Sequence, residues 1–521
     1  MNDAKYIIVG VTALTAVLMA TGCASPFNDD LYGTWQARDP DQWQLAEHGA
    51  KHSRTTLRSR LAAPEAAAAE AAALGSDAGI DQYLRVALDH NPSIRAAERR
   101  VERLGARVPQ ATSLDDPMFQ IAPFGEMAET AAGQVGVMTG VSQKLPFPGK
   151  LDTRGQIAQQ DVAMALADLQ QTRLRVVAET RRAYWSYYFT TRALDTTRQS
   201  RKLLDQFKQI AEAEYKAGNR SQPDVLRASV ELSNVDNELI ILAQRQATAR
   251  SMLNQLMDRP IDAALPEPAT VTLDQVDTDL DVFLARAAKD NPAIEALHAR
   301  IEQHRQRRRL ARLNRWPDLT VSASYNIVED DGLSMAANGD DQWWFGFGVN
   351  LPIWMEKYDA AEREAFQGIL EGVADLTAEH NRIAFQVQEA YLKVEAQQQL
   401  VTLFRDTIVP QARQTVEASR SGYRAGSVDF LTLMDNWRKL LNFELMQHRA
   451  LAEMEQAVAD LERAVGGQVD RHADPDRSGH EPAPPSASQP TSRPPPPRWA
   501  VLPLALRHRS SPPAGCCHRR Q

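Results

Sequence analysis

The most regular pattern along the chain is a spacing of apolar residues by alternating steps of four and three, between about Tyr358 and Tyr423. The residues in this series are Ile369, Val373, Leu376, Ile383, Val387, Ala390, Val394, Val401, Phe404 and Ile408, with His380 and Gln397 filling its two gaps. A repeat of about 3.5 residues is typical of helices that supercoil around one another. The pattern therefore predicts one long helix, with a kink where Pro410 interrupts it.

A matching series occurs in the first half of the chain, between Arg154 and about Lys216. Its members are Val162, Leu166, Leu169, Val176, Ala183, Tyr187 and Leu194. The segment contains no proline, so it predicts an uninterrupted helix of about 60 residues, which is roughly 90 Å long.

A glycine follows each long helix. Gly218 ends the motif Tyr-Lys-Ala-Gly, and Gly426 ends the motif Tyr-Arg-Ala-Gly. Glycine readily adopts the left-handed conformation that ends a helix. We therefore expect each long helix to reverse at its glycine into an antiparallel partner, over residues 221–257 and 427–465. Such long helices need neighbours of this kind to be stable.

Before each long helix the apolar period changes to two. DLTVSASYNIV (residues 318–328) alternates strictly, and so does an aromatic segment at residues 342–353. In the aromatic segment, one face holds Trp343, Phe345, Phe347, Val349 and Leu351, and the other holds Trp344, Gly346, Gly348 and Asn350. The first half of the chain has similar runs at residues 117–124 and 134–145, the latter with Val135, Val137 and Val141 in phase. The alternation predicts four strands in two hairpins, each with one apolar face.

Strands of about ten residues with this alternation suit a tilted membrane β-strand, whose lipid-facing side is apolar. Trp343, Trp344 and Trp354 lie near the strand ends, where aromatic residues meet the membrane interface. A soluble, half-buried sheet that caps a helical domain shows the same alternation, so the pattern leaves both alternatives open. Four strands cannot close a barrel, and lipid does not tolerate open edges. A membrane location therefore requires several copies of the chain.

The two halves are copies of one another. YLRVALDHNPSIRAAERRVE at residues 83–102 resembles FLARAAKDNPAIEALHARIE at residues 283–302, with their Asn-Pro pairs 200 positions apart. The motifs AYWSYY and AYLKVE lie 207 positions apart, and the two turn glycines lie 208 apart. The resulting division of the chain is a signal peptide at 1–22, a linker at 23–78, repeats at 79–260 and 278–466, and a Pro-rich, disordered tail at 467–521.

The N-terminal residues have the pattern of a targeting segment. Lys5 precedes an apolar stretch, which leads through small residues into Cys23. This ending resembles a bacterial lipobox, in which the cysteine is acylated and becomes the mature N-terminus. Ala24 follows it rather than an aspartate, which favours the outer membrane. An ordinary cleaved signal peptide is the alternative. Beyond this segment, the sequence has no apolar stretch long enough for a transmembrane helix.

Composition narrows the function classes. The formal net charge is −8, which argues against nucleic acid as a partner, and the basic run at residues 298–315 is better explained as a solvated helix face. No nucleophile, acid–base or phosphate-binding constellation indicates an enzyme. The 11 histidines and 3 cysteines lack the spacing of a metal site, so we assign neither a metal site nor a cofactor.

Taken together, these landmarks resemble the TolC outer-membrane efflux family over residues 79–466. LPFPGK at residues 145–150 is one of these landmarks, and its FPGKL form at residues 147–151 is most similar to the heavy-metal branch, typified by the CusC and CzcC proteins. The resemblance implies a mainly helical chain with membrane β-strands, three copies of which form a 12-stranded barrel on a periplasmic helical tunnel. It further implies partners: a periplasmic membrane-fusion adaptor, an inner-membrane pump of the RND type and outer-membrane lipid. The expected role is passive export without catalysis.

The resemblance also implies a gate of acidic residues at the periplasmic tip. A match from Gly426 puts Asp435 at one acidic position and Thr432 at the other, with Asp429 nearby and Asp224 at the equivalent place in the first repeat. Three copies turn each aspartate into a ring that favours cations. The alternative is a solvated acidic helix cap. The sequence does not indicate whether the substrate is a metal or a drug. The alternative function is that of a lipid-anchored periplasmic coiled-coil adaptor or scaffold.

Overall fold

A computed structural model of the protein describes residues 79–124, 129–218, 221–268, 274–275, 279–469 and 472–473. The predicted signal peptide, Cys23 and the linker up to residue 78 lie outside the described residues, as does the predicted tail from residue 474 onward.

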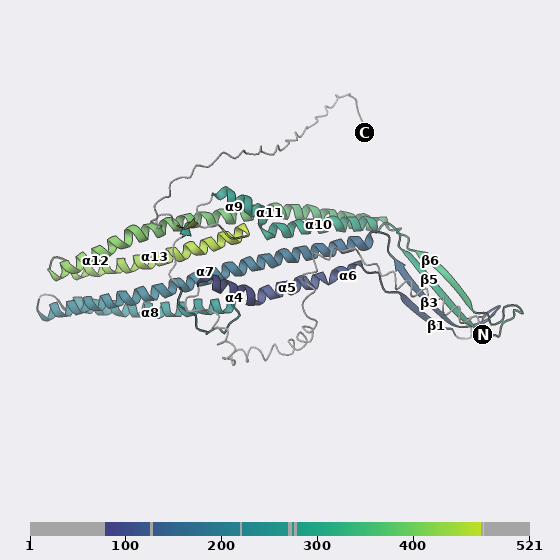
Figure 1. The fold of residues 1–521 in the computed structure, drawn as a ribbon, viewed down its shortest axis with the longest axis horizontal. Helices are drawn as coiled ribbons and strands as arrows, with labels where there is room; N and C mark the ends of the chain where they lie inside the picture. Colours follow the sequence, from purple (N-terminus) through teal and green to yellow (C-terminus); the bar gives the residue numbers. More distant parts are fainter. Residues whose placement is uncertain are drawn as a thin grey trace, which may run out of the picture. The chain divides into compact units, whose positions relative to one another are not determined.

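The first repeat consists of short helices, a strand pair and a long helical hairpin (Figure 1). Its elements are α4 (Ile80–His90), α5 (Pro92–Gly105), α6 (Arg107–Thr112), β1 (Met118–Pro123), β2 (Glu129–Thr130), β3 (Gly133–Leu145), α7 (Lys150–Lys216) and α8 (Gln222–Leu256). Helix α7 has 67 residues without a break, as the absence of proline predicts.

The second repeat follows the same order. Its elements are α9 (Leu280–Asp290), α10 (Pro292–Leu313), β5 (Leu319–Val328), β6 (Gln342–Val349), α11 (Met355–Leu403), a π-helical turn η2 (Phe404–Ile408), α12 (Val409–Arg424) and α13 (Phe430–Val465). The π-helical turn ends two residues before Pro410, whose ring and missing N–H interrupt α-helical bonding. The long helix of this repeat is therefore divided, whereas α7 is continuous.

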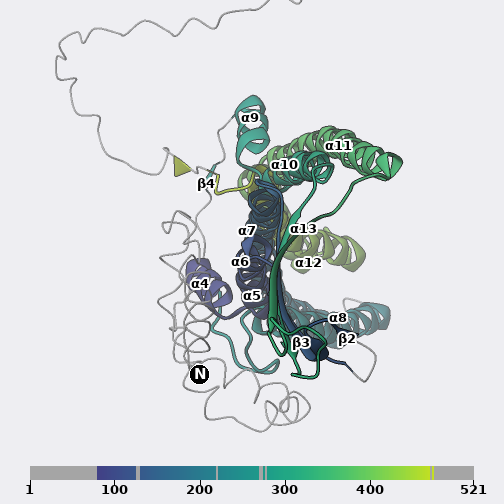
Figure 2. The same cartoon turned by 90° about the vertical axis from the view of Figure 1, so that its right-hand side faces the viewer.

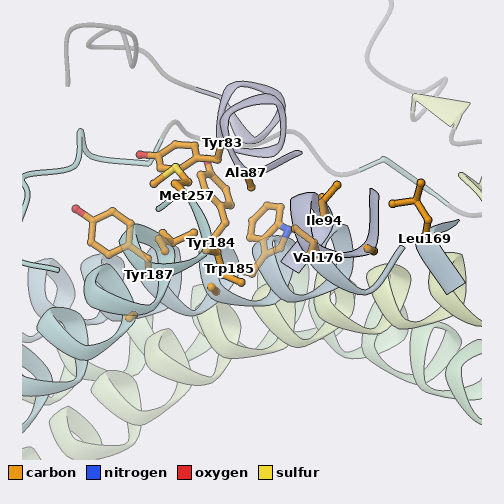
Figure 3. Close-up of a cluster of buried hydrophobic side chains, with 14 of the residues drawn as sticks. Tyr83, Ala87, Ile94, Leu169, Val176, Tyr184, Trp185, Tyr187 and Met257 are labelled. Atoms are coloured by element: carbon orange, nitrogen blue, oxygen red, sulfur yellow. The ribbon is translucent and has the colours of Figure 1, made fainter. Parts of the chain in front are cut away.

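Helix α7 is covered by helices of both repeats. It packs against α4, α5, α6 and α8 of its own repeat and against α10 and α13 of the second. A cluster of aromatic residues on α7 contacts Tyr83 of α4 and Met257 at the end of α8 (Figure 3). Within it, Trp185 makes edge-to-face contacts with Tyr184 and Tyr188. Such contacts add to the free energy gained by burying the rings.

A buried asparagine connects the two ends of each repeat. The Asn91 side chain caps α5 through the N–H two residues later, and its Nδ2 donates to the carbonyl of Leu256 at 2.9 Å. Asn291 does the same in the second repeat, donating to Ala464 at 2.8 Å and capping α10. The Asn-Pro pairs therefore start a helix and also attach it to the last helix of the same repeat.

The strands form one antiparallel sheet in the order β1-β3-β5-β6, and β2 pairs with the start of β3. The central pair, β3 with β5, joins the two repeats. Strands β1 and β6 are its outer strands (Figure 1). Val135 was expected in phase with Val137, but a bulge lies between them, and Val135 pairs with Val328 whereas Val137 pairs with Ile327. The extra residue moves Val135 to the opposite face, where it is buried.

The predicted apolar series of the second long helix is correct only in part. Its members from Ile383 to Val401 are buried, but Val373 is exposed. Ala365, Gly368 and Gly372 are buried in its place. An added Cβ at Gly372 would lie 2.8 Å from the Ile301 side chain of α10. The small residues therefore let α10 lie close beside α11 (Figure 2), which an apolar pattern does not reveal.

A second, two-stranded sheet joins β4 (Asp274–Gln275) to β7 (His472–Ala473). The predicted disordered tail from residue 467 is therefore wrong for its first residues, because β7 pairs with the segment between the repeats. Within the described part of the chain, no helix combines the length and the hydropathy needed to cross a membrane.

Candidate functional site

The sheet has one continuous apolar face. The pairing register places Phe119 opposite Val141, Val141 opposite Ala323 and Ala323 opposite Phe345. The full face comprises Phe119, Ile121, Val137, Thr139, Val141, Gln143, Leu145, Leu319, Val321, Ala323, Tyr325, Ile327, Trp343, Phe345, Phe347 and Val349. Most of its large side chains are exposed. An exposed apolar surface of this extent marks an interaction surface.

The opposite face of the sheet is small and polar. Ser142, Ser322 and Gly346 lie in one row across β3, β5 and β6, and Gly140, Ser324 and Trp344 lie in the next. The residues along each strand therefore alternate between an apolar and a polar face, as expected of strands with lipid on one side and water on the other.

The three tryptophans predicted at the interface lie in different places. Trp343 is on the apolar face near the start of β6, where its ring contacts Phe345. Trp344 is on the polar face, opposite Ser324. Trp354 follows the other end of β6, directly before α11, and is exposed. Trp343 and Trp354 thus mark the two ends of the exposed apolar surface.

A buried ion pair holds the base of the sheet to the helices. Lys150, the first residue of α7, donates from Nζ to Asp318 at 2.6 Å, and the Phe147 N–H donates to the same carboxylate at 2.9 Å. The Phe147 ring stacks on Trp316, with centroids 5.4 Å apart. Burial by itself raises the pKa of Asp318, but the hydrogen bonds from Lys150 and Phe147 outweigh it, so this pKa lies below its ordinary value. The motif LPFPGK therefore fastens the first repeat to the second.

The helix reversals are built as predicted. Gly218 and Gly426 have φ values of 77° and 80°, the left-handed region that glycine adopts without strain. The second turn is further closed by Tyr423 and Phe430, which are buried with ring centroids 5.5 Å apart. Tyr215, the matching residue of the first turn, is exposed.

The three acidic gate candidates have different surroundings. Asp429 is the N-cap of α13, and its side chain accepts from the Thr432 N–H at 3.4 Å. Asp435 is exposed and pairs with Lys439 one turn later at 2.7 Å. Asp224 lies in the first turn of α8, whose N-cap residue Ser221 makes no side-chain cap bond. The described contacts explain Asp429 as a helix cap and leave Asp224 and Asp435 at the surface of the tip.

Near the tip, one ion pair joins the two hairpins. Arg438 of α13 donates twice to Glu231 of α8, at 2.9 Å and 2.6 Å. Hydrogen bonds from the guanidinium hold the pKa of the Glu231 carboxyl below its usual value, against the opposing effect of burial. This bidentate pair fixes α13 against α8. Among the described residues, no three His, Cys, Asp or Glu side chains are grouped so that they can hold a metal ion.

Sequence reasoning missed two of these features. It used Asn91 and Asn291 only as landmarks, and it used LPFPGK only as a family motif. The one available signal was the equal position of the asparagines before proline in both repeats. Their acceptors lie 165 and 173 positions away, which no local pattern reveals.

Comparisons with known proteins agree with this architecture. A family model described as "Outer membrane efflux protein" matches residues 83–258 and 283–467. The cobalt-zinc-cadmium resistance protein CzcC of Cupriavidus metallidurans is 21% identical over 401 residues, which covers 74% of this chain and 90% of CzcC.

Solved structures share the fold at low identity. The outer membrane protein VceC of Vibrio cholerae has a TM-score of 0.63 and 20% identity, covering 75% of this chain and 97% of VceC. CusC has a TM-score of 0.60 and 17% identity, covering 75% and 92%. The predicted fold class, mainly helical with strands in a duplicated arrangement, is confirmed. Transport proteins rather than enzymes make up the matched family. The chain belongs to the outer membrane efflux protein family and is an outer-membrane efflux channel protein.

Proposed function

We propose that three copies of this chain form the exit duct of a tripartite efflux system that exports metal cations. The observation that carries the assembly is an exposed face on α11 that α7, its counterpart, does not have. With the AYWSYY and AYLKVE motifs aligned, Phe385 and Leu392 of α11 correspond to Ala178 and Trp185 of α7. Phe385 and Leu392 are 65% and 52% exposed, whereas Ala178 and Trp185 are 1% and 2% exposed.

The sheet supports the same conclusion. Its outer strands β1 and β6 each pair on one side only, and unpaired backbone groups are costly in lipid. Pairing of β6 with β1 of another copy removes both edges. Three copies then supply twelve strands, enough for a closed barrel with a polar lumen. The apolar face would contact lipid, with Trp343 and Trp354 at its two margins.

The substrate class rests on the relatives. CzcC is named for resistance to cobalt, zinc and cadmium, and FPGKL at residues 147–151 resembles the same branch. The acidic tip residues Asp224 and Asp435 would form rings of carboxylates in a trimer, which attract cations, whereas Asp429 would remain the cap of α13. We assign the gate to this tip. A drug channel is the second candidate, because the fold shared with the solved structures does not select a substrate.

A deletion strain tests the substrate. We expect loss of the protein to lower tolerance to Co, Zn, Cd, Cu or Ag and to leave drug tolerance unchanged, with the wild-type gene restoring growth. Altered drug tolerance with unchanged metal tolerance would assign the channel to drugs.

Anchoring and partners complete the proposal. Cys23 would carry the lipid anchor, the tips at Gly218 and Gly426 would meet a periplasmic adaptor, and an RND-type pump would supply the substrate. Cell fractionation distinguishes the duct from a lipid-tethered periplasmic adaptor or scaffold. A heat-modifiable trimer that stays in the outer membrane after an alkali wash supports the duct, and release of the Cys23→Ser variant by that wash contradicts it.

A further inference from the structure

We infer that Lys357 forms an ion pair with Asp116 of the partner subunit. This pair would join the bases of the sheets of two copies, as the pair between Lys150 and Asp318 joins the two repeats within one copy. The inference rests on the proposed trimer and adds a specific contact and strand register to it. The chain contains one repeat-to-repeat junction as a template, and the same elements are left unpaired at the opposite edges.

The template is the junction between β3 and β5. Lys150 at the start of α7 meets Asp318, which directly precedes β5, and Phe147 stacks on Trp316. Gln143 lies opposite Val321 on the apolar face of this strand pair. If the second repeat meets the first repeat of another copy in the same way, each of these residues has a counterpart.

The alternation of the strands selects those counterparts. Phe119 of β1 and Val321 of β5 both lie on the apolar face. Successive side chains of a strand alternate between faces, so the offset between β1 and β5 is even. An offset of 202 relates Asp318 to Asp116 and Trp316 to Leu114, whereas an offset of 203 would relate Asp318 to Asp115 and place Phe119 on the polar face.

The lysine is selected by position and by charge. The strands β3 and β6 are related by an offset of 206, and the long helices by 207. Lys150 therefore corresponds to Glu356 or to Lys357, at the start of α11. Only Lys357 attracts a carboxylate.

The proposed partners are available. Lys357, Asp115 and Asp116 are all exposed, and none forms an ion pair with another described residue. Leu114 and Ile353, which correspond to Trp316 and Phe147, are exposed as well. An apolar contact between Ile353 and the partner's Leu114 would replace the stacked rings. The template also fixes the strand register: Val349 of β6 lies opposite Phe119 of the partner subunit, as Gln143 lies opposite Val321.

Charge reversal tests the ion pair. We expect Lys357→Asp or Asp116→Lys, each in the full-length protein, to raise the fraction of dissociated subunits about tenfold, because each trimer loses three exposed pairs and gains repulsion. The double variant Lys357→Asp/Asp116→Lys should restore the trimer. Glu356→Lys, one residue away, serves as the control: alone it should leave the trimer intact, and combined with Asp116→Lys it should not restore the trimer. The fraction is measured by size-exclusion chromatography with light scattering in detergent.

Cysteine pairs test the register in the same protein, with Cys516 and Cys517 replaced by serine. Val349→Cys with Phe119→Cys should form a disulfide between subunits on mild oxidation, because directly opposite Cβ atoms lie about 5 Å apart. Phe347→Cys with Phe119→Cys, shifted by one pair, should not. A stable trimer without double-variant rescue, or with the shifted disulfide, overturns the inference and leaves the proposed function standing. A wild-type protein that is monomeric overturns both.

Discussion

The two long helices of the chain have the same origin but different surroundings. Helix α7 packs against helices of both repeats, whereas α11 packs against α9, α10 and α13, all of its own repeat. The difference is seen at matched positions: where α7 buries Ala178 and Trp185, α11 exposes Phe385 and Leu392. A duplicated chain can form the repeat-to-repeat interface only once by itself. In the proposed trimer, a second interface of this kind would form with another copy of the chain.

The helical partners show the complementary difference. The turn glycines relate Leu226 of α8 to Met434 of α13. Met434 is buried, whereas Leu226 is exposed together with Val230 and Ile240 of α8. Since α13 packs on α7, the exposed residues of α8 are the expected cover for α11 of another copy.

The largest effect is expected from alanine substitutions at a matched pair of positions on the two long helices. Trp185→Ala should lower the free energy of unfolding of the subunit by about 3–5 kcal/mol, because it removes a fully buried ring from an aromatic cluster. Leu392→Ala should leave the subunit almost unchanged and should weaken assembly by about 2 kcal/mol per interface. Urea unfolding followed by circular dichroism measures the first effect, and light scattering measures the second. Equal effects of both variants on subunit stability would contradict the proposed difference.

The asparagine of each Asn-Pro pair makes a contact that both repeats share, and its substitution tests that contact. Asn91→Ala and Asn291→Ala should each lower stability by about 2–3 kcal/mol, since each loses a helix cap and leaves a buried carbonyl without its donor. Asn91→Asp keeps the capping oxygen and loses the donor, so it separates the two contributions. Urea unfolding of the same preparations measures all three. A large effect in one repeat and none in the other would show that the two contacts are not equivalent.

Local patterns predicted the elements of the fold well, since a period of about 3.5 or 2 reports which side of a helix or strand is apolar. They predicted continuous α7 and the interruption at Pro410, and the structure has a strand in each of the four alternating segments. The errors arose where packing overrides pattern. Val373 is exposed because Gly368 and Gly372 form the contact with α10, and Val135 changes face at a bulge.

The candidate site was less predictable than the fold. The turn glycines could be recognised, since a positive φ is a local requirement. The Lys150–Asp318 and Arg438–Glu231 pairs join residues 168 and 207 positions apart, and charge alone does not select such partners. The tip aspartates remain predictions, because their role in a gate depends on what three copies bring together.

A smaller effect is expected from the ion pair that joins the hairpins near the tip. Arg438→Ala should lower stability by about 1–2 kcal/mol at neutral pH, because Glu231 is left partly buried without its donor. The pKa of Glu231 is depressed in the folded protein, so its contribution is fully present above the unfolded value of about 4.3 and is lost as the pH falls through the lower folded value.

The pH dependence of stability tests whether Arg438 acts through the Glu231 carboxylate. Wild type and Arg438→Ala should therefore differ in thermal midpoint at pH 7, and the difference should begin to shrink near the unfolded pKa of about 4.3 and vanish at still lower pH. Arg201→Ala breaks the exposed pair with Asp236 within the first hairpin and serves as the comparison, since exposed pairs contribute little. A difference between wild type and Arg438→Ala that persists unchanged at low pH would contradict the assignment to Glu231.

The smallest structural effects, and the sharpest functional ones, are expected at the tips. Asp224 of the first repeat corresponds to Thr432 of the second, so the two tips differ in charge at a matched position. Asp224→Asn and Asp435→Asn should change stability by less than about 0.5 kcal/mol, because both side chains are at the surface and Asp435 loses only a pair within one helix. Asp429→Asn keeps the cap of α13, since asparagine caps as well as aspartate, and removes only its charge.

Reversal potentials in planar bilayers under a KCl gradient separate the three aspartates. If Asp224 and Asp435 line the gate, each of their substitutions removes three carboxylates from the constriction and should lower cation selectivity, whereas Asp429→Asn should leave it nearly unchanged because that side chain is turned to the helix N-terminus. Thr432→Asp then restores the matched charge in the second repeat and should raise cation selectivity above wild type. A selectivity that responds to Asp429→Asn alone would move the constriction to the cap and leave Asp224 and Asp435 as solvated surface residues.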